Sequence, residues 1–129
     1  MMRFGRGWQE VAERRKARRE REDSSRRLHD VVPKLERFHL EVSVEREGVV
    51  LMGTAHVRRF VVANAPALFV LPCTDEDCKD GGHDVTDGVV RSLQNSLERF
   101  DIVNRCNGQI GSTSCKRVMH LAGAAGYRA

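Results

Sequence analysis

Residues 38–45, FHLEVSVE, decide the fold, because apolar and polar side chains alternate along them. An alternation with a period of two predicts a strand with one buried face and one exposed face. Residues 46–48 then supply a turn, and residues 49–57 are predicted to return as the second strand of a hairpin. The fold is therefore expected to be built on an antiparallel sheet.

Four further segments complete the predicted domain. Residues 67–71 form an apolar run that is predicted to be a buried strand. Residues 85–99 carry an apolar face at helical spacing, with Asp84 as the expected N-cap. A short strand is expected at 101–105. Residues 115–128 favour a closing strand, although their alanine content would also fit a helix.

The N-terminal segment differs from the rest of the chain in charge and in pattern. Residues 1–34 carry 11 Lys and Arg against 6 Asp and Glu, a net charge of +5, whereas residues 35–129 carry a net charge of −1. Residues 8–32 contain no Pro or Gly and are predicted to form a helix that ends before Pro33. Residues 14–27 include a single apolar residue, so they have no stripe with which to pack on a core. They are expected to be a solvated helix, or partly disordered until a partner binds.

The size of the chain leaves room for one domain and an appendage. Of its 129 residues 40% are hydrophobic and 31% are charged, which is lean in core material, and small cores of this kind often need a metal or disulfides. The predicted fold class is α+β: an antiparallel sheet packed on one helix with a structural zinc site, preceded by an extended basic N-terminal helix. The predicted division is a basic helical extension over residues 1–34 and a zinc-stabilised domain over residues 35–129.

Four cysteines form two pairs, with the spacing Cys73-x4-Cys78 and Cys106-x8-Cys115. Zinc is usually bound by four such ligands in a tetrahedron, as two pairs from two loops. The N-terminus has no apolar signal peptide, so a cytoplasmic, reducing location is expected, where cysteines are more often metal ligands than disulfides. The cysteines are therefore predicted to bind one structural Zn2+ ion, with two disulfides as the alternative. His83 is close enough in sequence to replace one cysteine or to donate a hydrogen bond to one.

The sequence contains no convincing catalytic constellation. It has no Walker loop, no G-x-G-x-x-G and no nucleophile elbow. Asp75, Glu76, Asp77 and Asp80 surround the first cysteine pair and should raise the pKa of a free thiol there, which favours a metal ligand over a nucleophile. No catalytic residue and no small-molecule substrate are therefore predicted. The alternative is a thiol-based redox protein or a metal-dependent enzyme that uses the cysteine pairs.

Seven of the eight residues 14–21 are charged, and six of them are basic. The six are Arg14, Arg15, Lys16, Arg18, Arg19 and Arg21. Such a run can neutralise phosphates and release counterions, and it can also meet an acidic protein surface. Glu13, Glu20 and Glu22 cancel part of the charge, so a solvated helix without a partner is the alternative. Residues 1–34 are predicted to contact RNA or a larger protein complex, and no membrane partner is expected, because no apolar stretch is long enough for a span.

The cysteines and the residues between them follow a recognisable order, LPC at 71–73, Cys78, GGHDVT at 81–86, Cys106-x-Gly108 and Cys115. This order resembles that of a poorly characterised group of small bacterial proteins with a Cys–Cys–GGHD–Cys–Cys pattern. The resemblance implies a compact α+β unit with a metal site, and it implies no activity or catalytic residue. The sequence thus predicts a non-enzymatic, zinc-stabilised binding or accessory protein.

Overall fold

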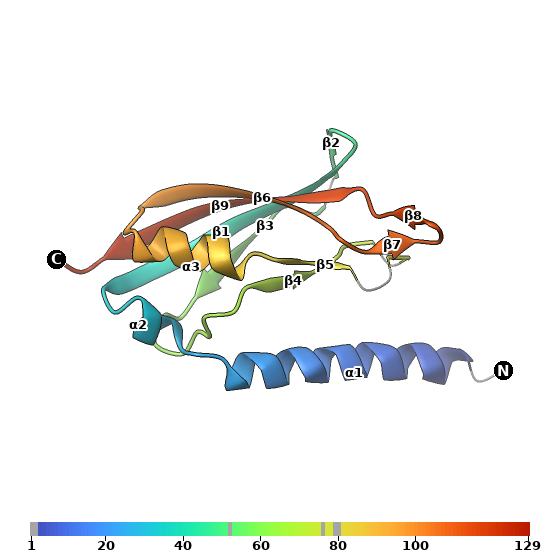
Figure 1. Ribbon diagram of the computed structural model, residues 1–129, viewed down its shortest axis with the longest axis horizontal. Coiled ribbons are helices and arrows are strands. Elements are labelled where there is room, and N and C mark those ends of the chain that lie inside the picture. The colour runs from blue at the N-terminus through green and yellow to red at the C-terminus, as the bar shows by residue number, and fades with distance from the viewer. Residues whose placement is uncertain (1–2, 52, 76, 79–80) are drawn as a thin grey trace.

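The computed structural model describes residues 3–51, 53–75, 77–78 and 81–129 (Figure 1). The helices are α1 (Arg3–Ser24), α2 (Leu28–Val31) and α3 (Thr86–Gln94). The strands are β1 (Leu35–Arg46), β2 (Val49–Val50), β3 (His56–Phe60), β4 (Val70–Pro72), β5 (Gly82–Asp84), β6 (Arg99–Arg105), β7 (Gln109–Ile110), β8 (Thr113–Ser114) and β9 (Arg117–Tyr127). The predicted α+β class with an antiparallel sheet is confirmed.

The main sheet has five strands, and its pairings are all antiparallel. β1 and β9 lie side by side at its centre, in a register that runs from Leu35↔Tyr127 to Arg46↔Arg117. β6 pairs with the other side of β9, and β3 and β2 share the remaining side of β1. The strands predicted from residues 38–45, 101–105 and 115–128 are therefore confirmed as β1, β6 and β9.

One face of this sheet carries the core. The apolar residues of the alternating stretch, Phe38, Leu40, Val42 and Val44, are all buried, as the pattern predicts. The ring of Phe38 lies 4.9 Å from that of Phe60, stacked, and 6.2 Å from that of Phe100, measured between centroids. These aromatic contacts link β3, β1 and β6 across the buried face.

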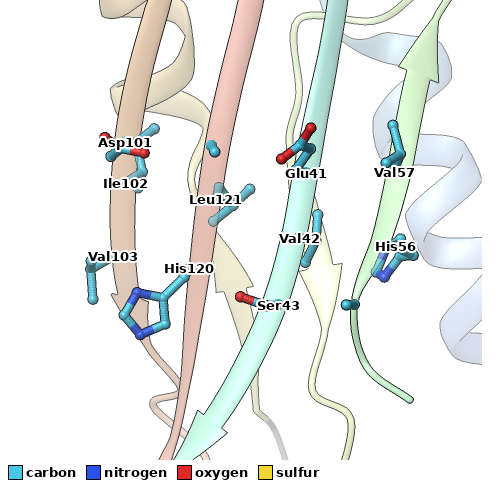
Figure 2. A pocket seen from close by; sticks show the side chains of 12 residues that line it. Glu41, Val42, Ser43, His56, Val57, Asp101, Ile102, Val103, His120 and Leu121 are labelled. Atoms are coloured by element: carbon cyan, nitrogen blue, oxygen red, sulfur yellow. The ribbon is translucent and has the colours of Figure 1, made fainter. Parts of the chain in front are cut away.

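Helices and the β4–β5 hairpin cover the buried face (Figure 1). Val89 and Leu93 of α3 are fully buried there, and so is Leu28 of α2, so more than one helix contributes to the core. In the described residues no helix or hairpin covers the opposite face, which Figure 2 shows from close by. We call this opposite face the open face. It is lined, among others, by Glu41, Ser43, Val57, Asp101, Val103, His120 and Ala122.

The single helix predicted over residues 8–32 is interrupted. α1 ends at Ser24 and α2 begins only at Leu28. Between them Arg27 forms an isolated antiparallel bridge with Pro66, and the N–H of Leu28 donates to the carbonyl of Ala65 at 2.8 Å. These tertiary hydrogen bonds replace helical ones because Leu28 turns into the core. None of the helices in the described ranges is long and apolar enough to cross a membrane.

Three further predicted boundaries are wrong, and three short strands were not predicted. The strand expected at 67–71 begins only at Val70, as β4. The returning strand expected at 49–57 is divided into β2 and β3, because Gly53 between them adopts a φ of +82°. The helix expected to reach residue 99 ends at Gln94, and Ser96 follows with a φ of +58°. The unpredicted strands are β5, β7 and β8.

Candidate metal centre

Each cysteine pair lies in a loop that joins two antiparallel strands. Cys73 follows β4 and Cys78 precedes β5, while Cys106 follows β6 and Cys115 precedes β9. The second loop also contains the small β7–β8 hairpin, which closes at Gly111 with a φ of +61°. The two loops meet at the same end of the molecule (Figure 1), so residues 28 positions or more apart become neighbours.

The four sulfur atoms form one cluster. All four Sγ atoms lie within 4.8 Å of one another. The Sγ atoms of Cys73 and Cys115 are 3.7 Å apart, and those of Cys78 and Cys106 are 3.6 Å apart. A tetrahedron with metal–sulfur bonds of about 2.3 Å has edges of about 3.8 Å. The four cysteines are free thiols at the spacing of a tetrahedral metal site, so the predicted ligand set is brought together.

Backbone amides point at two of these sulfurs. The N–H of Asp75 donates to Sγ of Cys73 at 3.5 Å, and the N–H of Gly108 donates to Sγ of Cys106 at 3.4 Å. Both donors lie two residues after the cysteine, so the two loops turn in the same way around the first ligand of each pair. Amide donors stabilise thiolate charge, which is the form of cysteine that binds metals.

Two glycines allow the loops to approach. A Cβ atom at Gly81 would meet Sγ of Cys78 and lie 2.6 Å from Sγ of Cys106. A Cβ atom at Gly108 would meet Sγ of Cys78 and lie 2.5 Å from Cα of Gly81. Any side chain at either position would therefore push into the cluster or into the facing backbone.

The pKa values of the thiols depend on burial and on the neighbouring sulfurs. Burial raises the pKa of Cys73 to about 11, and it raises the pKa of Cys78 further. Burial opposes ionisation of Cys106 as well, but hydrogen bonds from the amide of Gly108 and from neighbouring thiols hold its pKa below the ordinary value. The pKa values of Cys73 and Cys78 are raised, but burial and the neighbouring thiols cause the rise, and not the acidic side chains from which it was predicted.

The acidic residues of the first loop have other roles. The carboxylate of Asp75 accepts a hydrogen bond from the N–H of Asp77 at 3.0 Å and lies 3.6 Å from Nε of Arg117. Glu76 and Asp80 lie outside the described residues. Arg117 also donates from Nη1 to Oγ1 of Thr74 at 2.5 Å. Arg117, at the start of β9, therefore links the strand that follows the second loop to Thr74 and Asp75 of the first loop, and it neutralises the charge of Asp75.

Sequence reasoning missed this role of Arg117. The available signal was its position two residues after Cys115, in the pair Lys116–Arg117. Lys116 is different, because it forms an exposed ion pair with Glu47 at 3.1 Å. Lys116 and Arg117 are distinguished only by their tertiary contacts, because Arg117 reaches the first cysteine loop and Lys116 does not.

His83 is fully buried on β5 and is not part of the sulfur cluster. Its Nδ1 lies 2.9 Å from Oδ1 of Asn104, which joins β5 to β6. In the described part of the chain the ligand group consists of four sulfur atoms and no histidine nitrogen. The structure therefore gives His83 a packing and hydrogen-bonding role between two strands, away from the direct ligation considered from the sequence.

The predicted contact residues lie elsewhere. Arg14, Arg15, Lys16, Arg18, Arg19 and Arg21 are all on α1, and residues 12–21 are exposed without interruption. Among the described residues, none of these six side chains forms a hydrogen bond or an ion pair with the four cysteines. The metal centre and the basic residues are thus two separate features.

The open face has a hollow of about 490 Å³. Its floor includes Ala122 of β9, whose small side chain separates Glu41 on β1 from Asp101 on β6 (Figure 2). His120 beside them lies 3.1 Å from the carboxylate of Glu45. No three ligand atoms of His, Cys, Asp or Glu converge in this hollow among the described residues.

In comparisons with known proteins, no family model, no curated protein and no solved structure matches the chain. The resemblance to the Cys–Cys–GGHD–Cys–Cys group therefore stays a prediction.

Proposed function

We propose that the protein is a non-enzymatic binding or accessory module in which one structural Zn2+ ion holds the two cysteine loops together. The observation that carries this proposal is the closed set of four sulfur donors within 4.8 Å. Structural zinc sites have four protein ligands, whereas catalytic sites keep one position for water or substrate. An ion bound by four thiolates has no open position, so its role is to hold the fold.

The surroundings of the cluster suit such an ion. Four thiolates and one Zn2+ carry a net charge of −2, which needs nearby donors and positive charge. The amides of Asp75 and Gly108 supply donors, and Arg117 neutralises the carboxylate of Asp75 in the loop that carries Cys73 and Cys78. Iron can also take four thiolates in a tetrahedron, so elemental analysis of the purified protein has to identify the metal. One zinc per chain is the expected result.

The alternative is a redox protein or an enzyme that uses the thiols directly. A reactive cysteine needs an accessible thiolate in electropositive surroundings. Cys78, Cys106 and Cys115 are buried, and the partly exposed Cys73 has a pKa of about 11. The most accessible thiol is therefore protonated at neutral pH without a metal, which disfavours this alternative.

The contact function is proposed for α1. Arg14, Arg18 and Arg21 follow one another along one side of the helix over about 10 Å, and Arg15 and Arg19 form the adjacent row. Lys16 extends the same basic surface. Glu13 and Glu20 fall on the opposite side of the helix, whereas Glu22 lies between the two arginine rows and cancels part of their charge. We propose that this basic face binds RNA, and a larger protein assembly with an acidic surface is the second candidate.

Replacing Arg14, Arg18 and Arg21 by Ala in the full chain is expected to weaken RNA binding and its salt dependence. Each lost phosphate contact reduces the slope of log K against log salt by about 0.7 for a single strand, so three lost contacts reduce it by about 2. The measurement is fluorescence anisotropy with single-stranded RNA across a salt series. The matched control changes the same three residues to Lys, which keeps the charge and should keep the slope.

A wild-type chain without salt-dependent RNA affinity would contradict the RNA proposal. The two candidates also separate in native lysate, where the size of the complex containing the full chain is measured with and without ribonuclease. A complex that ribonuclease dissolves supports RNA. A complex that resists ribonuclease but is lost in the three-alanine variant supports the protein assembly instead.

A further inference from the structure

β6 forms one edge of the five-stranded sheet. It pairs with β9 on one side, and in the described residues no strand pairs with its other side. In Figure 2 β6 is the outermost strand on the left, and the side chains of Asp101 and Val103 belong to it. An unpaired edge presents a row of free N–H and C=O groups to solvent, which favours pairing with another strand.

Two hydrogen bonds determine which backbone groups of β6 are free. The N–H of Ala125 donates to the carbonyl of Glu98, and the N–H of Cys106 donates to the carbonyl of Arg117. At both ends of β6, the backbone groups of an even-numbered residue therefore point toward β9. The register between them is regular. Because the direction alternates along an antiparallel strand, the N–H and C=O groups of residues 99, 101, 103 and 105 point away from β9.

The side chains of these same residues form a self-complementary pattern. Asp101, Val103 and Arg105 stand on the open face, one after another, and all three are exposed. Val103 is 62% exposed, which is high for a β-branched residue in a strand. The order is acidic, apolar, basic, so a second copy of the same strand running in the opposite direction presents basic, apolar, acidic.

We propose that two copies of the chain join edge to edge through β6, with a two-fold axis at Val103. In this register Val103 faces the partner's Val103, and Asp101 faces the partner's Arg105 on both sides of the axis. The outward N–H and C=O groups of these three residues bond to those of the partner, because directly opposed residues with outward-facing backbone groups form hydrogen-bonded pairs. The result is one continuous sheet of ten strands.

Neighbouring registers are less favourable. A two-fold axis at Asp101 would place two Asp side chains opposite each other, and an axis at Ile102 would place Arg99 opposite the partner's Arg105. Directly opposed like charges destabilise a strand pair. Axes at Phe100 or Asn104 avoid like-charge pairs, but each overlaps only three residues of β6, whereas the axis at Val103 overlaps five. Charge and overlap together therefore favour the register centred on Val103.

The strand β3 on the other edge of the sheet does not have a self-complementary pattern of charges. β3 carries two consecutive arginines, Arg58 and Arg59, and both are exposed. Any two-fold pairing centred on them places Arg opposite Arg. Charged residues on an edge strand are a common protection against pairing. Charge complementarity thus points to β6 as the dimer edge and to a second copy as its occupant.

The test reverses one charge at a time and then combines the variants. The full-length, metal-loaded wild-type chain in reductant is expected to sediment as a dimer, at twice the chain mass of 14.6 kDa. D101R and R105D are each expected to be monomers, because each places like charges opposite one another at two positions. An equal mixture of D101R and R105D should form a heterodimer, and the double variant D101R/R105D should dimerise like the wild type.

The metal content and the circular dichroism spectrum of each variant are measured to check that it is folded. This check is needed for R105D in particular, because Arg105 directly precedes the ligand Cys106. The matched control is R59D on the β3 edge, which should remain a dimer. A wild-type chain that is a monomer at the highest concentration reached would overturn the proposal. A dimer that survives D101R and R105D, or two monomeric variants that fail to associate when mixed, would overturn it as well. The proposal does not depend on RNA binding, so its failure leaves that function unaffected.

Discussion

Removal of the metal is expected to unfold the domain. The two cysteine loops connect β4 to β5 and β6 to β9, so the cluster joins the β4–β5 hairpin to the main sheet. Zinc binding by small structural sites contributes about 10–16 kcal/mol in zinc-finger peptides. Domains of this size are stable by only about 5–15 kcal/mol, so the metal term is large enough to decide folding. The measurement is thermal unfolding by circular dichroism in reductant, before and after a strong chelator.

A cysteine variant gives the same result without a chelator. Cys106→Ser removes a buried ligand and leaves the other three sulfurs too few for a closed site. We expect less than one zinc per chain and loss of the cooperative transition. Ser114→Ala is the matched control, because Ser114 is exposed beside the ligand Cys115 and should keep both the metal and the transition. A metal-free wild-type chain with an unchanged transition, or one whose cysteines oxidise in pairs while it stays folded, would contradict the structural role.

The central strands could be predicted because their pattern is local. Burial alternates along β1 as the sequence 38–45 indicates, and the closing strand at the C-terminus follows the same rule. A strand with one buried face has to alternate, whatever its neighbours are. The pattern cannot reveal the strand order, because β9 pairs with β1 over a separation of more than 70 residues.

The unpredicted elements depend on tertiary contacts. β5 has three residues, and it exists because Leu71 of β4 pairs with His83. α1 ends at Ser24, where the hydroxyls of Ser24 and Ser25 donate to the carbonyls of Arg21 and Glu22, and the backbone of Arg26 then accepts a hydrogen bond from Ala67 at 2.7 Å. The pairing of β5 and the hydrogen bond to Ala67 join residues too far apart for a local signal, whereas Ser24 and Ser25 are a local signal for the end of α1. Local propensity is overridden where the chain enters the core.

The four cysteine ligands of the candidate site could be predicted from the sequence, but the residues that surround and position them could not. Four cysteines in two pairs were enough to suggest a metal, and the structure brings the four sulfurs together. The bridge from Arg117 to Thr74 and Asp75 depends on which loop faces which, and that is a property of the fold. The exact donors, Asp75 and Gly108, likewise depend on loop conformation. Glycines near the cysteines were visible in the sequence, but their close contact was not.

Gly108→Ala is expected to cost the protein most of its metal affinity while keeping all four cysteines. The added Cβ would meet Sγ of Cys78 and lie 2.7 Å from the backbone nitrogen of Gly81, so it has to separate the two loops. Loss of supporting groups around a metal typically reduces affinity by about 10- to 100-fold, and a steric displacement of a ligand should reach the upper end. Competition with a chromophoric zinc chelator measures this loss.

Gly111→Asn is the matched control for Gly108→Ala. Gly111 lies in the same loop, and no atom lies within 4 Å of a Cβ placed there. Its φ of +61° is tolerated by Asn better than by other residues with side chains, so the variant should lose little stability and keep its zinc. Equal zinc affinity in Gly108→Ala and the wild type would mean that the loops do not close around the metal as tightly as the four sulfurs indicate. A selective loss at Gly108, with four intact thiols, would show that the approach of the two backbones and not the number of cysteines limits metal binding.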